Sequence, residues 1–386
     1  MKYEASAVQA FLQRIVESLD AQIQHIEAAS PRTFYGNVFS EIPEAGYWVA
    51  TGKGRVRHIA DKISASLAST GTPSYFVDAA NEAHGLPLLS PSSRVLLLWR
   101  RHQPVADLVR LLEAVPASVA VDIVTDATDL PAKRTGNFFR IVGAESSALE
   151  VPNDIVALAV GDSFVAGLES ARKFTELDFL KDHPKGSLGK TIAAHRTARE
   201  IPYLPPPVQA LNALKEEREG VRSLLEGIDI TAVTEWLGVF SRPWERIITT
   251  GMGKPGYCMR YLAFLLNELG RSSFYLHPAE GVHGDLGRIG ERSLVVAYSH
   301  SGETDEVLNI LPRMKERGAT LLALANNTAS TMAKAADAVL KAGAPEVDPI
   351  RKAPTGSTTA ALSLATALVC SDRPATEQGS RGGIRS

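Results

Sequence analysis

The sequence predicts an α/β protein with two doubly wound parallel sheets in tandem, and two observations support this fold class. The first is an internal repeat, in which Gly52 corresponds to Gly251 and His84 to His283, each pair 199 residues apart. The second is an alternation, in both halves, of short aliphatic runs with amphipathic stretches. Continuous apolar strands separated by helices are typical of parallel sheets that helices cover on both faces.

Each half contains a comparable series of predicted strands. In the N-terminal half they are residues 46–51, 74–79, 94–99 and 118–125, and in the C-terminal half residues 246–250, 272–276, 293–299, 319–326 and 337–343. A proline-rich stretch, residues 199–209, separates the two series, and residues 210–228 have helical periodicity. We therefore expect an N-terminal domain at 1–198, a linker and helix at 199–228, a C-terminal domain at 229–372 and a disordered tail at 373–386.

The composition is that of a globular protein with a small-molecule partner. Of 386 residues, 45% are hydrophobic and 22% charged, and the net charge is −2 with scattered basic residues, which gives no sign of a nucleic-acid or anionic-membrane surface. Cys258 and Cys370 lie in apolar segments without a CxxC motif, so we expect reduced core thiols. The N-terminus does not fit a signal peptide, and we expect a cytoplasmic protein.

Three loops of the C-terminal half are candidate ligand-binding segments. Ligands of open parallel sheets bind beyond the carboxyl ends of the strands, where such loops lie. The first is the glycine-rich turn 251–256, whose Lys254 can meet an anion. The second, 299–306, gathers hydroxyls around Gly302, which suits the phosphate of a sugar better than a nucleoside triphosphate. The third, 354–359, carries further hydroxyls, and by itself it also fits a simple helix cap.

Four segments, GMGKPG, HPAEGVHGDLG, SHSGETDEV and APTGSTT, occur in an order and spacing that resemble the sugar isomerase (SIS) domain family, and within it the arabinose-5-phosphate isomerases. The resemblance covers residues 245–370. The N-terminal half resembles the same family through ASTGTPSYFV and through residues 174–190. The pair of CBS domains that often follows the SIS domain in that family is absent here, and the second SIS copy stands in its place.

The resemblance implies a set of site residues. The implied catalytic residues are Lys254, Glu306, Glu346 and His183, and the implied substrate-binding residues are Gly253, His283, Ser299, Ser301, Thr304, Thr355, Ser357 and Thr358. In the family the histidine at the position of His183 reaches the active site of a neighbouring subunit. The tandem chain is therefore expected to fold as a pseudo-dimer in which the N-terminal half lends His183 to the C-terminal pocket.

The N-terminal copy departs from the family pattern at nearly every chemical position. Arg55 stands at the position of the lysine, LWRRHQPVA (98–106) replaces the hydroxyl turn and puts Ala106 at the first glutamate, and VPNDIVA (151–157) replaces the third loop. We expect this pocket to be catalytically silent, although Arg100 and Arg101 remain able to bind an anion.

The expected reaction is an aldose–ketose isomerisation of a sugar phosphate through an enediol, most like that between D-arabinose 5-phosphate and D-ribulose 5-phosphate, in the supply of Kdo for lipopolysaccharide or capsule. Such a reaction needs a carboxylate base and a cation or histidine near the enediolate, and no metal or organic cofactor. We assign the carbon-bound proton to Glu346, ring opening or transfer between the oxygens to His183, and orientation of the sugar hydroxyls to Lys254 and Glu306.

Three alternatives stay open at this point. SIS domains also serve as non-catalytic sugar-phosphate sensors. Residues 347–351, VDPIR, depart from the family pattern, so an isomerase of a hexose or amino-sugar phosphate is a second alternative. His277, His283 and Asp285 also have the donor types of a metal site, but a further ligand is missing and a packed or substrate-facing role is favoured. By analogy with four-domain assemblies, we expect a dimer of tandem chains.

Overall fold

The computed structural model describes residues 4–40, 46–81, 85–128, 130, 136–143, 150–182, 204–343 and 356–371. Four residues of the sequence analysis, His84, His183, Glu346 and Thr355, lie outside the described residues, as do the expected tail and residues 199–203 of the expected linker.

The N-terminal half contains a five-stranded, all-parallel sheet with the order β2-β1-β3-β4-β5. The four predicted strands are confirmed. Three of them, β1, β3 and β4, are buried almost throughout their length. The edge strand β5 was missed, since it has three residues of which the central one alone is buried. The strands are β1 (Trp48–Gly52), β2 (Ser74–Asp78), β3 (Arg94–Trp99), β4 (Ala120–Thr125) and β5 (Phe138–Arg140).

The C-terminal half repeats this arrangement with the sheet order β10-β9-β8-β6-β7, again all parallel. All five predicted strands are confirmed. They are β6 (Arg246–Gly251), β7 (Ser273–Leu276), β8 (Ser293–Tyr298), β9 (Thr320–Ala325) and β10 (Ala338–Lys341). The predicted fold class, two doubly wound parallel sheets in tandem, is therefore correct.

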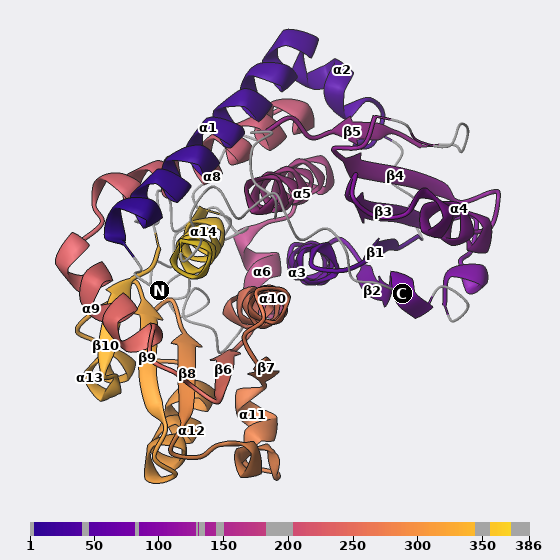
Figure 1. The fold of residues 1–386 in the computed structure, drawn as a ribbon. Coiled ribbons are helices and arrows are strands. Elements are labelled where there is room, and N and C mark those ends of the chain that lie inside the picture. The colour runs from indigo at the N-terminus through magenta and orange to yellow at the C-terminus, as the bar shows by residue number, and fades with distance from the viewer. Residues whose placement is uncertain are drawn as a thin grey trace.

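Helices of the two halves pack against each other between the sheets (Figure 1). The first helix after the first strand of each half, α3 (Val56–Ser69) and α10 (Lys254–Glu268), forms one such contact. The last long helix of each sheet domain, α5 (Val151–Arg172) and α14 (Gly356–Cys370), forms another, and α5 also packs on α3 as α14 packs on α10. The remaining helices are α2 (Pro31–Tyr35), α4 (Val105–Ala114), α6 (Glu176–Asp182), α9 (Ile230–Phe240), α11 (Pro278–Gly281), α12 (Asp305–Glu316) and α13 (Thr331–Ala335).

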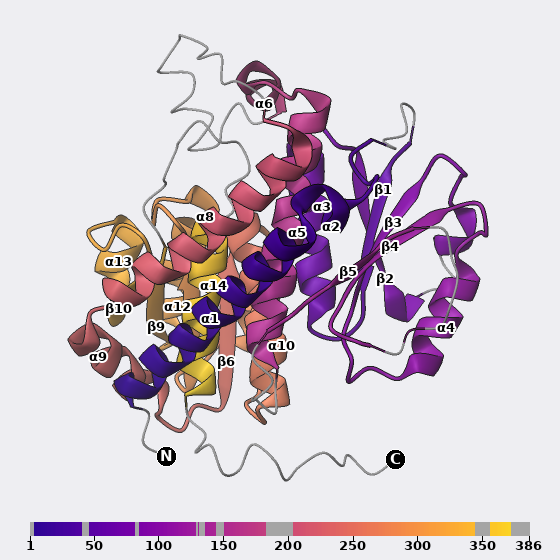
Figure 2. The ribbon, with the colours of Figure 1, turned by 90° about the horizontal axis from the view of Figure 1, so that it is seen from above.

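Two long helices cross from one half to the other. The helix α1 (Ala5–Ala29) lies beside α8 (Pro206–Glu226), and both pack against α5 of the N-terminal half and α14 of the C-terminal half (Figures 1 and 2). Asp20 on α1 accepts from Arg218 at 2.5 Å and from Arg222 at 3.1 Å on α8. The helix predicted at 210–228 is confirmed as an element, and its packing shows that it covers both halves.

The helix α5 is buried along nearly its whole length. Its length and its mean hydropathy of 1.3 meet those of a membrane span, yet the whole of that apolar window is buried inside the protein. Its neighbours α1, α3, α8 and α14 surround it, which explains why it is apolar on all sides. Three acidic groups interrupt it, Asp154, Asp162 and Glu169, and the first two are fully buried. Buried carboxylates need partners, and Asp154 and Asp162 bind Arg55 and Lys62 respectively.

Candidate active site

The C-terminal site lies at the point where the strand order reverses. Neighbouring strands β6 and β8 end together, with Gly251 opposite Tyr298, while the chain continues from β6 to β7 on one side and from β8 to β9 on the other. Such a switch point leaves a crevice beyond the carboxyl ends of the strands. Lys254 opens the helix that follows β6, and Ser299 directly follows β8, so both flank this crevice.

Lys254 is half-buried, and three charged residues of the N-terminal half act on it. Burial and the nearby ammonium of Lys62 lower the pKa of Lys254 from 10.5 to about 7, against the opposing effect of Asp162 and Glu169. Lys62 lies on α3, and the two acids lie on α5. A lysine that titrates near neutrality inside a crevice is typical of a functional group rather than of a solvated surface residue.

Lys62 and Asp162 form a buried ion pair next to this lysine, and sequence reasoning missed both residues. The ammonium of Lys62 donates to both carboxylate oxygens of Asp162, at 2.5 Å to Oδ1, and the two residues are 2% and 0% exposed. The sequence carries a signal for Asp162 alone, which is a charged residue in an otherwise apolar run of α5, whereas Lys62 stands among other polar residues of α3. Lys62 also lies 199 residues before Tyr261, a buried residue of α10. The repeat therefore places Lys62 on the face of α3 that is directed toward the other half.

The hydroxyl loop after β8 is tightly held by its own side chains. Ser299 Oγ lies 2.8 Å from Thr304 Oγ1 and accepts the backbone N–H of Gly302 at 3.1 Å, while Ser301 Oγ accepts the N–H of Glu303 at 3.2 Å. Gly302 has φ +70°, and a Cβ there would lie 2.0 Å from the hydroxyl of Ser330. The loop is therefore a preformed turn with hydroxyl groups at the start of α12.

The other predicted residues of this edge differ in their placement. Gly253 has φ +63° and ψ −134°, and a Cβ there would meet no atom within 4 Å, so the backbone borders open space. Glu306 lies in the first turn of α12 and is exposed. His283 is exposed in the loop after α11, beyond the edge strand β7. Within the described ranges no three His, Cys, Asp or Glu side chains gather as metal ligands, so His277 and Asp285 do not form a metal site with it there.

The start of α14 is held against the same crevice. The hydroxyl of Tyr298 donates to the carbonyl oxygen of Ser357 at 3.5 Å, and the thiol of Cys258 donates to the carbonyl oxygen of Thr358 at 3.9 Å. The helix beginning with Lys254 and the strand preceding Ser299 thus both contact the third predicted loop. Cys258 and Cys370 are buried free thiols, as predicted.

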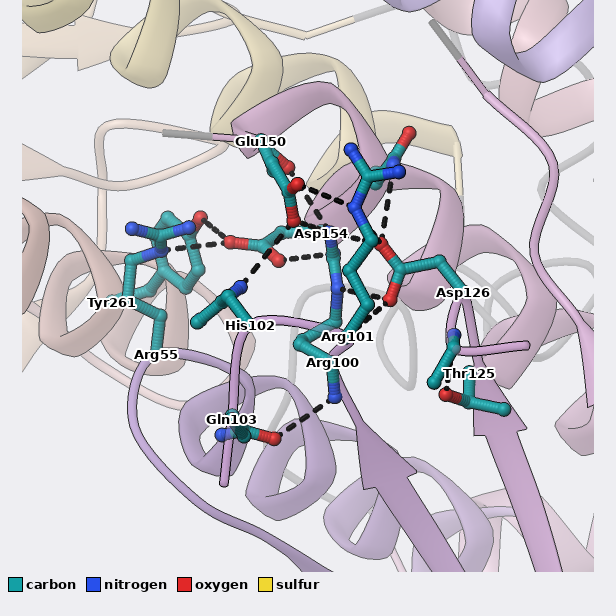
Figure 3. A network of polar contacts seen from close by, with 12 residues as sticks. Arg55, Arg100, Arg101, His102, Gln103, Thr125, Asp126, Glu150, Asp154 and Tyr261 are labelled. Atoms are coloured by element: carbon teal, nitrogen blue, oxygen red, sulfur yellow. Dashed lines mark hydrogen bonds and ion pairs between the residues drawn. The ribbon is translucent and has the colours of Figure 1, made fainter. Parts of the chain in front are cut away.

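The equivalent edge of the N-terminal half is filled by charged side chains (Figure 3). Arg55, at the position of Lys254, and Arg100, which directly follows β3, both bind the carboxylate of Asp154. Arg100 also donates to Asp126 at 2.9 Å, and Glu150 accepts from Arg101 at 2.6 Å. No hydroxyl turn of the kind that follows β8 occurs at this position.

Comparison with known proteins agrees with this division of the chain. The model of the SIS domain family matches residues 242–371. Arabinose 5-phosphate isomerase KpsF of Escherichia coli is 39% identical over 168 residues, which are 43% of this chain and 52% of that protein, so the chain spans about half the length of the curated relatives it matches. A solved structure from E. coli CFT073, in complex with A5P, is 31% identical over 41% of this chain and 83% of that one, with a TM-score of 0.35.

Another solved structure resembles the fold over nearly the whole chain. The C-terminal domain of glucosamine-fructose-6-phosphate aminotransferase from Francisella tularensis matches 94% of this chain and 95% of its own, with a TM-score of 0.64 at 15% identity. At that identity the likeness concerns the fold alone. Residues 242–371 therefore match a SIS domain, and the two-sheet architecture of the whole chain resembles that solved structure in fold.

Proposed function

We propose that the protein is a phosphosugar aldose–ketose isomerase that interconverts D-arabinose 5-phosphate and D-ribulose 5-phosphate at the C-terminal switch point. The observation that carries this proposal is Lys254, a half-buried lysine with a pKa of about 7 that opens α10 beside the hydroxyl turn. The sequence likeness to arabinose 5-phosphate isomerases covers this same region. A sensor needs an anion site, but it does not need a lysine poised near neutrality.

The proposed chemistry follows from the groups at the site. A carboxylate base removes the proton from C1 of the ketose or C2 of the aldose, and returns it to the other carbon after the enediolate has formed. The protonated Lys254 stabilises the negative charge of the enediolate, and the hydroxyl turn with the N-terminus of α12 holds the phosphate. Glu346 is the proposed base, and Glu306 orients the sugar hydroxyls. No step of this scheme uses a metal or organic cofactor.

We propose further that His183 completes this site from the N-terminal half. Glu169 acts electrostatically on Lys254, so the C-terminal part of α5 lies toward the C-terminal pocket. The chain continues from α5 through α6, and the described residues end at Asp182, directly before His183. A histidine contributed there assists ring opening or proton transfer between the two oxygens.

The wider role follows from the same relatives. We propose that the enzyme acts in the cytoplasm, as a dimer of tandem chains, in the supply of arabinose 5-phosphate for Kdo. The family likeness in sequence supports this assignment, and the N-terminal copy takes the place that a second SIS subunit holds in a symmetric assembly.

The test is incubation of the purified full-length chain with ribulose 5-phosphate in the presence of EDTA, with chromatographic detection of arabinose 5-phosphate. Turnover that is lost in Lys254→Met supports the proposal. Tight binding of ribulose 5-phosphate without turnover would show a sensor. Turnover of a hexose or amino-sugar phosphate in place of the pentose phosphate would show a different substrate for the same site.

A further inference from the structure

The N-terminal pocket is built around one buried carboxylate. Asp154 Oδ2 accepts from Arg55 Nε at 2.8 Å and from the hydroxyl of Tyr261 at 2.6 Å, and Oδ1 accepts from Arg100. Asp154 is 0% exposed, and it lies in the first turn of α5, where the helix dipole favours an anion. Two guanidinium groups, a hydroxyl and a helix N-terminus thus converge on a single anion, which is how proteins bind the oxyanions of ligands.

The location of this carboxylate matches that of a ligand site. In this sheet the strand order reverses between β1 and β3, where Gly52 lies opposite Leu98. Arg55 follows β1 as Lys254 follows β6, and Arg100 follows β3 as Ser299 follows β8. The cations therefore stand at the positions that flank the crevice in the C-terminal half, and both are aimed at Asp154.

We propose that Asp154 is a built-in anion that occupies the N-terminal pocket in place of a phosphosugar. The cations suited to a carboxylate or phosphate are present, but the anion that they bind is supplied by α5 of the same chain. This inference does not depend on the reaction of the C-terminal site.

The charges around Asp154 support a filled pocket. Burial alone would raise the pKa of Asp154, but Arg55 and Arg100 outweigh burial and hold it below its ordinary value, so the group stays ionised. Arg55 donates to Glu268 as well, at 2.5 Å, and Arg101 at the rim is paired with Glu150. Each of these three arginines already has a carboxylate partner, so an incoming phosphate would have to displace one.

The bound anion also joins the two halves. Tyr261 and Glu268 both belong to α10, the helix that begins with Lys254, whereas Arg55 and Asp154 belong to the N-terminal half. The cluster around Asp154 thus links α10 to α5 and to the residue before α3, and Figure 3 shows Tyr261, Asp154 and Arg55 together. These contacts between the halves explain why the N-terminal copy retains cations at this edge although it lacks the hydroxyl turn.

Chemical rescue tests the proposal. Asp154→Ala removes one carboxylate and leaves a space of that size between the arginines, which formate fits in shape and charge. We expect the Tm of Asp154→Ala to fall well below that of the unmodified protein. Sodium formate should then raise it by several degrees more than sodium chloride of equal ionic strength does.

Two variants serve as matched controls. Asp154→Asn keeps the shape and fills the space, and Ile155→Ala removes an equally buried neighbour on α5 without freeing a cation. Both should be destabilised, and neither should respond to formate more than to chloride. A folded Asp154→Ala protein that gains no more from formate than Ile155→Ala does would overturn the proposal.

A second measurement holds even if Asp154→Ala does not fold. Crystals of the unmodified protein soaked in inorganic phosphate are expected to show no phosphate beside Arg55 and Arg100. A phosphate bound there, with Asp154 displaced or not, would show that the pocket is open to ligands and would refute the built-in anion.

Discussion

Asp61 and Arg260 occupy equivalent positions in the two halves and bind each other. They are 199 residues apart, the offset of the internal repeat, and Arg260 NH1 lies 3.2 Å from Asp61 Oδ2. The pseudo-twofold axis between α3 and α10 therefore passes close to this ion pair. In a dimer of identical subunits the same residue would face itself across such an axis. The covalent duplication allows opposite charges there, which makes the pairing of the two halves specific.

This ion pair should contribute modestly to the free energy of unfolding, and losing Arg260 should cost more than losing Asp61. Its side chains are 34% and 23% exposed, so a coupling free energy of about 0.5–1 kcal/mol is expected between Asp61→Ala and Arg260→Ala in urea unfolding. Arg260 also lies over the ring of Tyr275 at 4.9 Å, so its loss should cost more than that of Asp61. Arg292→Ala, which breaks an exposed pair with Glu245, is the control with little effect. Equal costs for Asp61 and Arg260 would contradict the role of the ring contact.

The buried pair Lys62–Asp162 should behave differently from the exposed one. Asp162→Asn leaves the ammonium of Lys62 buried without its carboxylate, and we expect a loss of about 3–5 kcal/mol in the free energy of unfolding. The double change Lys62→Met with Asp162→Leu removes both charges and should recover most of that loss. Urea denaturation measures both variants, and a double variant no more stable than Asp162→Asn would show that the pair itself is strongly stabilising.

Lys254 should make stability depend on pH. Its pKa in the folded protein is about 7, below the ordinary 10.5 of the unfolded chain, so the unfolded state binds more protons between these values. The unfavourable contribution is complete below about pH 7 and fades as the pH rises toward 10.5. Lys254→Met should therefore raise Tm at pH 6 by a few degrees and by much less at pH 10. A Tm gain independent of pH, measured by calorimetry, would contradict the lowered pKa.

Deprotonation of Lys254 should also lower the rate of the proposed reaction at high pH. The cationic form of Lys254 stabilises the enediolate, so kcat/KM should decline as the pH rises through about 7 in the free enzyme. Lys62→Met removes the neighbouring ammonium that lowers this pKa, and the decline should move to higher pH. A profile of kcat/KM between pH 5.5 and 9.5 measures the shift, and an unchanged descending limb would exclude Lys254 as its source.

Two glycines of the site should differ in what alanine costs. Gly302→Ala places a Cβ 2.0 Å from Ser330 Oγ at φ +70°, so both strain and a clash oppose it, and we expect a loss above about 3 kcal/mol. Gly253→Ala meets open space and bears the strain of its φ of +63° alone, about 1–3 kcal/mol. Urea unfolding compares them, and a Gly253→Ala protein that is the less stable of the two would contradict the geometry.

The shared-site proposal makes His183 essential. His183→Ala should reduce kcat at least 100-fold, the lower bound for a general acid–base group, with little change in Tm. His102→Ala is the control, because His102 is exposed in the N-terminal pocket and bonded to Glu150 there. Full activity of His183→Ala would leave the C-terminal half as a self-sufficient site.

The sequence was sufficient for the sheets because their signals are local. Nine predicted strands are runs of aliphatic, aromatic or β-branched residues of ordinary length, and the constant repeat offset gave the correspondence of the halves. The edge strand β5 was missed, since Phe138–Arg140 is too short to show a pattern. The part played by α8 in covering both halves was missed as well, because packing partners do not follow from helical periodicity.

The candidate site was predictable in its loops but not in its surroundings. Lys254, Ser299 and Ser357 could be placed because each follows a strand or opens a helix at one sheet edge. Lys62 and Asp162 come from the other half, and their closeness to Lys254 depends on how α3 and α5 pack against α10. The partnership of Arg55 with Asp154 likewise joins residues that lie 99 positions apart.

The course of α1 has a consequence for how the protein can be divided. This helix begins the chain, yet it packs against α14 and α9 of the C-terminal half as well as against α5. A fragment that starts at residue 229 would lack α1 and α8 and would expose the apolar surfaces of α14 that they cover. The C-terminal half is thus not a module that can be transplanted by cutting between the sheets, because the helices α1 and α8 cover part of its core.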